Sequence, residues 1–392
     1  MYFIFILIFI FIIYKKMKSL LNIIFLILSS LYLSSCSFQT TFFKEINTQY
    51  KGKNVIVSPL SAYQVLGLTT NGANGQSQEE MLLALENKDL EELNEINSEI
   101  LKVSKEFSTI EIANAIMTAF TPKEKFVDIA LQYESSIEPL KSVTQVNNWC
   151  NLKTHGKIPK IMDQLPPNTV MVLLNALYFK GEWVKEFSEN LTTTRAFYNF
   201  NDESKSTQIP MMLAKDNYNY YEDSQQQIIE IPYKKDYMSA VIILPSQSID
   251  INKYISKLDD DTIQKLIKKM STKEVQLQLP KFELEFDSTL NEILQKMGMV
   301  QVFDQSLADL SGMRDGKDIY IGQVLQKTYL KVDEKGSEAA AVTAVVVQTK
   351  SMPLNNNRMI INRPFLFMLR NKKLPQNYEM LFMAKIEQLG NK

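Results

Sequence analysis

The segment from Ala339 to Val347 constrains the fold most, because it holds only Ala, Val and one Thr, without charge, Gly or Pro. If it forms a strand, alternate side chains point to opposite faces of a sheet. One face carries no charge and nothing larger than Val: Ser337, Ala339, Ala341, Thr343, Val345 and Val347. Gly336 precedes the run and supplies a flexible backbone. The segment is therefore suited to be a central strand with one face against a packed core.

The residues that follow this run are typical of an exposed loop. Residues 349–357 read TKSMPLNNN, and Lys350 is the only Lys or Arg between Lys335 and Arg358. Such a loop offers one preferred bond, Lys350–Ser351, to a protease whose specificity pocket carries an Asp. By residue type alone, an ordinary core strand followed by a turn remains the alternative.

The bulk composition is that of a globular protein and excludes several classes. The chain has 392 residues, a formal net charge of −1 and 45% hydrophobic residues. A charge near zero argues against nucleic-acid binding, which needs a basic surface. With one His and two Cys, neither a disulfide framework nor a Cys/His zinc site can form. We expect no metal and no other cofactor.

The N-terminus carries two apolar runs, residues 2–14 and 20–33, separated by lysines. Each is shorter than the ~18–20 residues that span a bilayer as a helix. The second run follows Lys18 and precedes small residues, which fits the ~7–15-residue core of a secretory signal. Residues 1–35 are therefore expected to be a signal peptide, and Met17 offers an alternative start that would leave 1–16 as an upstream extension. The mature protein is expected outside the cytoplasm.

The sequence Leu33-Ser34-Ser35-Cys36 resembles the lipobox of bacterial lipoproteins. In that family the Cys becomes the lipidated N-terminus, so the resemblance implies a cell-envelope protein attached to the membrane through Cys36, with 36–45 as a short anchor segment. An ordinary signal peptide with an incidental Cys, and hence a secreted protein, is the alternative.

Residues 46–392 show no linker, repeat or low-complexity tract and are expected to form one domain. Helical spacing of apolar residues marks 58–73 and 77–107. Strand-like runs lie at 170–179, 239–245, 275–286, 328–334, 359–370 and 378–386. Because helices and strands mix without a regular βαβ alternation, the fold class is predicted to be α+β.

The sequence offers no convincing set of catalytic residues. The single histidine, His155, lies in a polar stretch next to Gly156 and is expected in a solvated turn rather than as a base. Cys150 is predicted to be a buried structural residue on an amphipathic helix. The glycines of 71–78 lack the Gly-Lys-Ser/Thr ending of a phosphate loop. The protein is therefore not expected to be an enzyme.

Residues Glu334–Thr343, EKGSEAAAVT, resemble the loop hinge of inhibitory serpins. Further stretches match in the family's order: 54–68, 170–183, 209–212, 231–245, 279–286, 296–313 and 363–386. The resemblance runs from about Ile46 to Leu389. It implies a single serpin domain with a large central sheet, two further sheets, about eight or nine helices and an exposed reactive-centre loop at about 335–357.

The resemblance implies a suicide inhibitor of trypsin-like serine proteases. The protease would cleave Lys350–Ser351 and form an acyl-enzyme, and the cut loop would insert into the main sheet as a new strand and trap the protease covalently. The family's usual spacing from hinge glutamate to cleaved residue also selects Lys350. A non-inhibitory binding or carrier protein on the same fold is the alternative. The protein is otherwise expected to be a monomer, with loop-sheet polymers as a hazard.

Matching positions carry further implied roles. The hinge comprises Glu334, Gly336, Ser337, Glu338, Ala339, Ala340, Ala341 and Thr343. The opening of the sheet involves Ser58, Ser61, Asn175, Gln326, Trp183 and Lys281, with a Lys281–Glu334 ion pair at the top of the sheet. Gln326 stands where many members have His, so we expect its hydrogen bonds to Asn175 to differ from theirs.

Overall fold

The computed structural model describes residues 37–104, 110–234, 237–337 and 357–390. These residues form nine α-helices and three β-sheets, so the α+β prediction is confirmed. Cys36, the hinge residues from Glu338 to Thr343 and the bond Lys350–Ser351 lie outside the described residues.

A five-stranded sheet contains two neighbouring parallel strands, β12 (Gln323–Val332) and β4 (Met171–Phe179), and we call the line along which they pair the seam. The order of the sheet is β11 (Phe282–Thr289), β12, β4, β2 (Ile110–Thr118) and β3 (Ser136–Pro139). At its centre β12 and β4 run parallel, paired from Gln323–Val172 to Tyr329–Tyr178, whereas β11 and β2 are antiparallel to the strands they flank. The two central strands are thus closed against each other.

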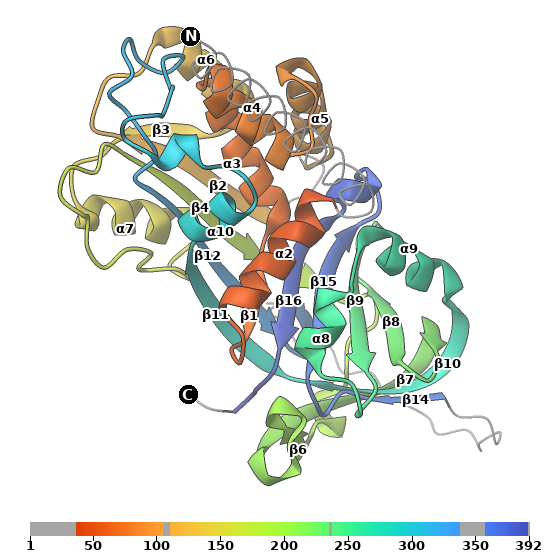
Figure 1. Cartoon of the computed structure of the whole chain (residues 1–392). Coiled ribbons are helices and arrows are strands. Elements are labelled where there is room, and N and C mark those ends of the chain that lie inside the picture. Colours follow the sequence, from red (N-terminus) through yellow and green to blue (C-terminus); the bar gives the residue numbers. More distant parts are fainter. Residues whose placement is uncertain (1–36, 105–109, 235–236, 338–356, 391–392) are drawn as a thin grey trace, which may run out of the picture.

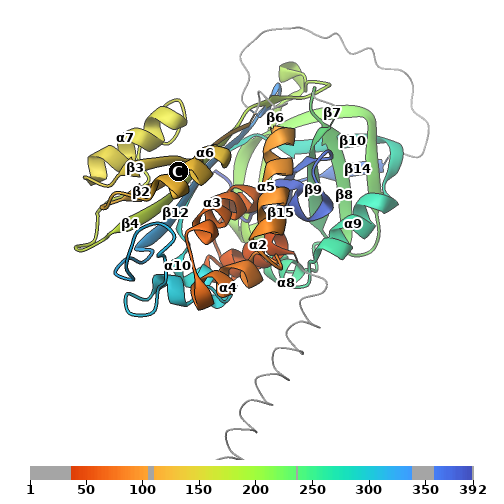
Figure 2. The same ribbon diagram turned by 90° about the horizontal axis from the view of Figure 1, so that it is seen from above.

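Both faces of this sheet are covered. On β4, Leu173 and Leu177 point into the main core, whereas Leu174 and Ala176 point outward to a second apolar cluster. That cluster includes Trp149 of helix α7 (Val143–Lys153). Figure 2 shows the sheet between α7 on one side and α3 (Pro59–Asn71) on the other. Coverage on both faces explains why β4 reads as a continuous apolar run.

Helix α3 packs against strands β2 and β4 and starts where its sequence predicts. Ser58 caps the helix by accepting a hydrogen bond from the Ser61 backbone N–H at 3.2 Å, and Pro59 occupies the first turn. Residues 59–70 are all buried. A helix buried on all sides fixes the polar side chains at its start beneath the sheet.

The second sheet wraps around the other half of the molecule (Figure 1). Its order is β1 (Val55–Val57), β16 (Met380–Ile386), β15 (Phe365–Asn371), β9 (Met238–Pro245), β8 (Gln226–Pro232), β7 (Ser206–Glu222), β10 (Ser271–Pro280) and β14 (Asn357–Ile360), with β6 (Thr193–Tyr198) paired to β7. Most of the main core belongs to these strands and to the helices packed on them. The remaining helices are α2 (Phe38–Gln49), α4 (Gly75–Ala84), α5 (Leu90–Ser104), α6 (Glu124–Gln132), α8 (Ile251–Ser256), α9 (Asp260–Lys269) and α10 (Asn291–Lys296).

Three stretches that we expected to be continuous are divided. The run 275–286 passes from β10 to β11 at Lys281 and so belongs to two sheets. The run 359–370 is interrupted before β15, at Pro364, whose missing N–H cannot join a ladder. The helix expected over 77–107 breaks into α4 and α5, because Glu86 adopts a φ of +61° and Asp89 caps the second helix through the Glu92 N–H at 2.9 Å.

The start of the described chain belongs to the folded body. Helix α2 begins within the segment 36–45, which we had set apart as an anchor, and its Phe38, Phe42 and Phe43 are buried in the core. Among the described residues no helix combines the length and the apolar character needed to cross a bilayer.

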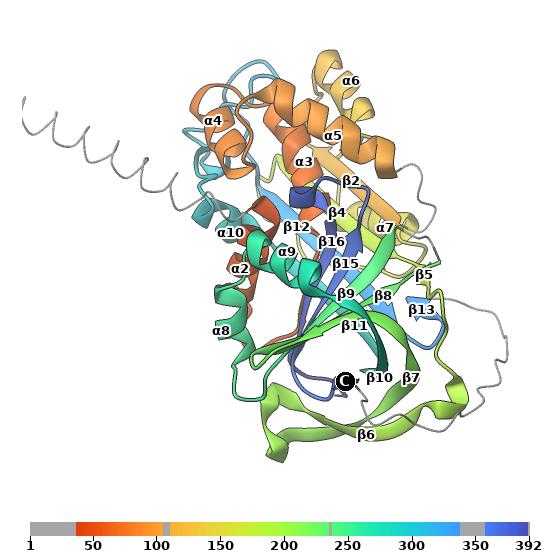
Figure 3. The ribbon, with the colours of Figure 1, turned by 90° about the vertical axis from the view of Figure 1, so that its right-hand side faces the viewer.

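The third sheet has two short strands, β5 (Gly181–Glu182) and β13 (Gly336–Ser337). Figure 3 shows them beside each other at one side of the molecule, opposite α2 and α8. Strand β13 contains two residues of the implied hinge, Gly336 and Ser337.

Candidate functional site

The hinge starts with a tight reversal of the chain after β12. Asp333 and Gly336 exchange backbone hydrogen bonds, with Asp333 N–H donating to the Gly336 carbonyl at 2.8 Å. The chain then runs antiparallel to β5, with Gly336 opposite Glu182 and Ser337 opposite Gly181. The first residues of the implied hinge therefore already form a short ladder.

Gly336 is required for this reversal. Its φ is +151°, and a Cβ at this position would lie 2.0 Å from the Gly181 carbonyl oxygen. Since real Cβ atoms do not come so near to backbone, any other residue would push β13 away from β5.

Ser337 is fully buried at the end of this ladder. Its hydroxyl lies 2.9 Å from the hydroxyl of Tyr233, whose ring stacks on Trp183 with centroids 4.3 Å apart. The indole N–H of Trp183 donates to the Asp333 carbonyl at 3.0 Å. Burial raises the pKa of Tyr233, so its hydroxyl stays protonated. The aromatic pair thus holds the hinge by one hydrogen bond on each side.

Glu334 joins three segments at the top of β12. Its carboxylate accepts from Lys281 Nζ and from Thr192 Oγ1, each at 2.8 Å, and its carbonyl accepts from the Phe187 N–H at 2.8 Å. Burial of this side chain disfavours its charge, but the bonds from Lys281 and Thr192 outweigh burial, so the pKa of Glu334 lies below its ordinary value. The carboxylate is therefore ionised at neutral pH.

Farther down the sheet, Gln326 ties the two parallel strands to α3. Its side-chain oxygen accepts from the Ser58 N–H at 3.1 Å, and its amide donates to the Ser58 carbonyl at 2.9 Å. The same amide donates to Asn175 Oδ1 at 2.7 Å across the β12–β4 seam. Gln326 is therefore bonded both to the backbone of Ser58, at the start of α3, and to the Asn175 side chain across the seam.

The polar row continues onto the next strand. Asn175 donates to the Ser61 hydroxyl and to Asn114 Oδ1 on β2, and the Ser61 hydroxyl also lies 3.3 Å from Asn114 Oδ1. We call these five residues the sheet-opening cluster: Ser58, Ser61, Asn114, Asn175 and Gln326. All of them are buried and none carries a charge.

Cys150 and His155, the two residues that a Cys-His catalytic site would need, lie on α7 and in the turn after it, and neither belongs to the hinge or to the sheet-opening cluster. Cys150 is buried on α7, and burial raises the pKa of its thiol to about 12, so this residue offers no thiolate nucleophile at neutral pH. His155 is exposed in the turn after α7, with a φ of +50°. The structural interpretation of both residues agrees with these positions.

The comparisons with known proteins identify the family to which this fold belongs. The profile of the family "Serpin (serine protease inhibitor)" matches residues 33–389. The chain belongs to the serpin family.

Similar proteins cover most of its length. "Intracellular coagulation inhibitor 2" from Tachypleus tridentatus is 31% identical, over 86% of this chain and 86% of that protein, and human serpin I2 is 31% identical over 89% of each. Tengpin, a thermophilic serpin solved in its native state, superposes with a TM-score of 0.82 at 31% identity over 90% of this chain and 92% of tengpin. Human thyroxine-binding globulin, at 24% identity and a TM-score of 0.80, shows the same fold over 90% of this chain and 96% of that protein.

The structure brings the residues of the sequence-based prediction together in two groups. Trp183, Lys281, Glu334, Gly336 and Ser337 meet at the hinge, and Ser58, Ser61, Asn175 and Gln326 meet at the seam. Sequence reasoning missed Asn114, Thr192 and Tyr233. Asn114 gave a usable signal, because it is a lone polar residue within the apolar strand IEIANAIMT. Tyr233 and Thr192 gave none, since only the tertiary fold sets them against the hinge.

Proposed function

We propose that this serpin is a suicide inhibitor of trypsin-like serine proteases that inserts its cleaved loop between β4 and β12. The observation that carries the proposal is the pairing of Ser337 with Gly181. Only Lys180 separates the end of β4 from the start of β5, so β5 is a continuation of β4. The side chains alternate without a break across this point: Phe179 and Gly181 are buried, whereas Lys180 and Glu182 are exposed. The ladder at β13 is therefore the first part of a longer ladder that β4 can offer.

Continuing that register along β4 supports the proposed orientation of the loop. Thr343 would come opposite Asn175, and residues paired across antiparallel strands point to the same face. Asn175 points inward to α3, so the inward set would be the small, uncharged one that starts with buried Ser337. Thr343 would then lie between Asn175 and Gln326 and could offer its hydroxyl to both amides as they separate.

The other face of the loop is also consistent with insertion. In the same register, Val342 would come opposite Ala176 and Ala344 opposite Leu174, which both lie under α7. Glu338 would come opposite exposed Lys180, beyond the helix. This arrangement gives a reason for an outward set that is apolar in its middle and polar at its ends.

Insertion must break the parallel ladder between β12 and β4 and would replace it with two antiparallel ones. Each inserted residue would add ladder hydrogen bonds worth about 1 kcal/mol net, in addition to buried methyl groups. Thirteen residues, 337–349, at ~3.3 Å each would carry an attached protease about 40 Å along the sheet. The closed seam therefore represents folding free energy that is withheld until the loop is cut.

Lys350 selects the protease. A lone lysine in the loop suits a specificity pocket with an Asp, so the proposed target cuts after Lys, and Thr349 and Met352 flank the bond. Incubation with trypsin should give a complex that survives denaturing electrophoresis, with new N-terminal sequence starting at Ser351. Clean cleavage without a stable complex would refute the inhibitory mechanism.

The register makes a second test possible. Thr343→Arg puts a charge on the proposed inward face, so insertion should stall and the inhibitor should become a substrate, measured as a rise in the inhibitor-to-protease ratio needed for full inhibition. Glu338→Arg introduces the same side chain at the proposed outward position beyond α7, where solvent screens its repulsion from Lys180, and should raise that ratio far less. If both variants trap protease at the wild-type ratio, the assignment of faces is wrong.

A non-inhibitory binding protein is the second candidate, since a structural neighbour is described as thyroxine-binding globulin complexed with thyroxine. Melting separates the two, because the inhibitory mechanism requires a large rise in thermal stability after cleavage at Lys350. Equal melting temperatures of the cut and intact proteins would favour the binding protein.

For localisation, we propose an extracytoplasmic protein attached through Cys36. The Ser37 backbone N–H donates to buried Asp260 at 2.7 Å, so a lipid on the preceding residue would hold the domain directly against the membrane. Mass spectrometry of the mature N-terminus tests this: a diacylated Cys36 supports attachment, and an unmodified N-terminus indicates secretion.

A further inference from the structure

A cleft of about 350 Å³ lies where several chain segments meet. Its walls come from the turn between β9 and α8 and from the residues after α2, after β6, just before β15 and just after β16. In Figure 1 these elements gather in the lower part of the molecule, where β6 and α8 are drawn. A volume of this size suits a small organic molecule.

Arg363 lines the cleft and is unusual in its partners. The guanidinium Nε and Nη2 both donate to the Pro245 carbonyl, at 3.1 and 2.9 Å, which leaves further N–H groups to bind something else. Burial lowers the pKa of Arg363, and no carboxylate among the described residues forms an ion pair with it. A partly buried guanidinium without an anionic partner raises the free energy of the folded state, because it loses part of its hydration and no ion pair offsets that loss.

The carboxylates that line the same cleft are already engaged. Glu387 pairs with the fully buried Lys385 at 2.9 Å and accepts from Asn252 at 2.7 Å. Asp250 caps α8 through the Lys253 N–H at 2.9 Å. Lys51 adds an exposed positive charge at the rim. Together with Lys385, the described residues at the cleft carry three positive charges, on Lys51, Arg363 and Lys385, against the two carboxylates of Asp250 and Glu387, so their sum is positive.

We propose that this cleft binds a small organic anion, whose carboxylate or phosphate group sits on the guanidinium of Arg363. Both groups offer paired oxygens that match the planar fork of an arginine, which a single lysine ammonium cannot imitate. The hydroxyls of Ser246 and Ser248, 3.3 Å apart at the cleft wall, offer additional donors to the bound group. Binding here needs no cut in the reactive loop, so it is independent of the inhibitory function.

The test is a titration of the intact, uncleaved protein by calorimetry and by thermal melting, at constant ionic strength set with chloride. Inorganic phosphate, acetate and neutral acetamide are the probes. We expect saturable binding of phosphate or acetate with a rise in melting temperature, and no effect of acetamide. Phosphate binding alone assigns the site to phosphate esters, and acetate binding alone to carboxylates. Absence of saturable binding for both anions overturns the proposal.

Variants locate the binding. Arg363→Gln should weaken anion binding at least about tenfold, and Arg363→Lys should weaken it less. Arg195→Gln is the matched control, because Arg195 is exposed on β6 and bonds only Thr193 through its Nε. An equal rise in melting temperature in all three variants would show a general salt effect and overturn the proposal.

A second pair of variants leaves Arg363 and its bonds to Pro245 intact. Ser248→Asp places a competing carboxylate at the exposed rim and should reduce phosphate or acetate affinity more than Ser248→Asn does, because Asn matches Asp in size, carries no charge and keeps an N–H donor. Equal affinities of these two variants would place the anion elsewhere.

Discussion

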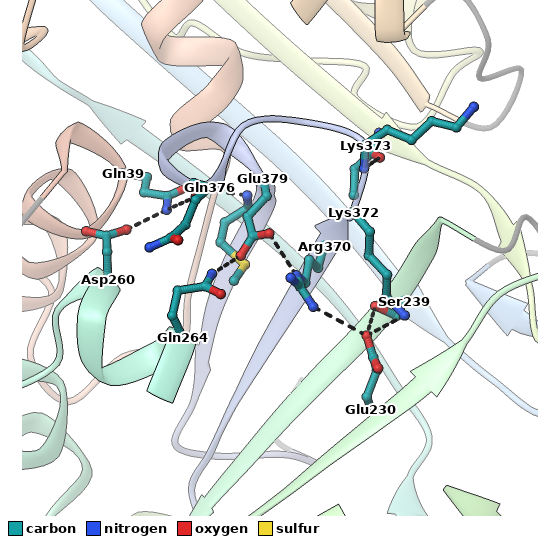
Figure 4. A network of polar contacts seen from close by, with 12 residues as sticks. Gln39, Glu230, Ser239, Asp260, Gln264, Arg370, Lys372, Lys373, Gln376 and Glu379 are labelled. Carbon is teal, nitrogen blue, oxygen red and sulfur yellow. Dashed lines mark hydrogen bonds and ion pairs between the residues drawn. The ribbon is translucent and has the colours of Figure 1, made fainter. Parts of the chain in front are cut away.

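Two buried polar networks in this molecule differ in charge. The sheet-opening cluster under the five-stranded sheet has only hydroxyls and amides. The second network, on the nine-stranded sheet and α9, is charged: Arg370 contacts Glu379 at 2.9 Å and Glu230 at 3.7 Å, and Lys372 contacts Glu230 at 2.8 Å (Figure 4).

The difference in charge matches what each region has to do. A buried ion that loses its partner suffers several kcal/mol of uncompensated desolvation, so a charged network resists rearrangement. Amides and hydroxyls both donate and accept, and can exchange one partner for another at a cost of about 1 kcal/mol. The seam that would separate in the proposed insertion is held by the exchangeable kind, and the sheet that would stay intact is held by the fixed kind.

The largest expected effect comes from breaking the charged network. Arg370→Met leaves Glu379 without its arginine and should lower the free energy of unfolding by about 3–5 kcal/mol. Burial already raises the pKa of Glu379 against the effect of Arg370, so removing the arginine should raise this pKa further. Urea denaturation at neutral pH measures the loss, with Arg195→Met as the exposed control. A loss below about 1 kcal/mol would show that the charged network does not hold this region in place.

A smaller effect is expected from putting a titratable group into the uncharged cluster. In Gln326→His, burial should lower the imidazole pKa below its ordinary value of about 6.5. A lowered folded-state pKa of a base means that stability is present at high pH and falls as pH drops below 6.5, by about 1 kcal/mol near pH 5.5.

Melting temperatures between pH 7.5 and 5.5 measure this slope. The substitution should be made together with His155→Asn to remove the other histidine, and its profile compared with that of His155→Asn alone, because burial raises the pKa of Glu86 to about 7 and this carboxyl titrates in the same range in both proteins. Identical profiles of the two variants would mean that water reaches the cluster and that its burial does not control opening.

The smallest expected effect concerns the ion pair at the hinge, which lies between the two extremes. Lys281 is 41% exposed, so the pair with Glu334 should contribute less than about 1 kcal/mol. Because the pKa of Glu334 is lowered, this contribution is present above the ordinary glutamate pKa of about 4.3 and is lost as pH falls through the lowered value. The melting temperatures of wild type and Lys281→Met should therefore differ at pH 7 and converge below pH 4. A difference that persists in acid would assign the effect to packing of the lysine stem.

Much of this architecture could be predicted from local sequence. Ser58-Pro59 marks the start of α3, and the apolar run before Lys180 marks β4, because capping and hydrophobic patterning act over a few residues. The hinge glutamate and Lys281 were paired only through the family resemblance, and the structure places them 2.8 Å apart.

What escaped prediction depends on contacts between distant segments. Nothing around Tyr233 shows that its hydroxyl lies against Ser337, which is 104 residues away. The run 275–286 has the same strand pattern throughout, so its transfer between sheets at Lys281 follows from the neighbours β7 and β12 and not from its own residues.

The bond between Thr192 and Glu334 has a practical consequence for producing the protein. Thr192 is the third residue of Asn190-Leu191-Thr192, an acceptor sequence for N-linked carbohydrate, and Asn190 is exposed. A eukaryotic secretory host that recognises it would attach a bulky glycan beside the hinge. Replacing Thr192 to prevent this would also delete a hydroxyl that holds the hinge, whereas Asn190→Gln would remove the sugar and leave that hydroxyl in place.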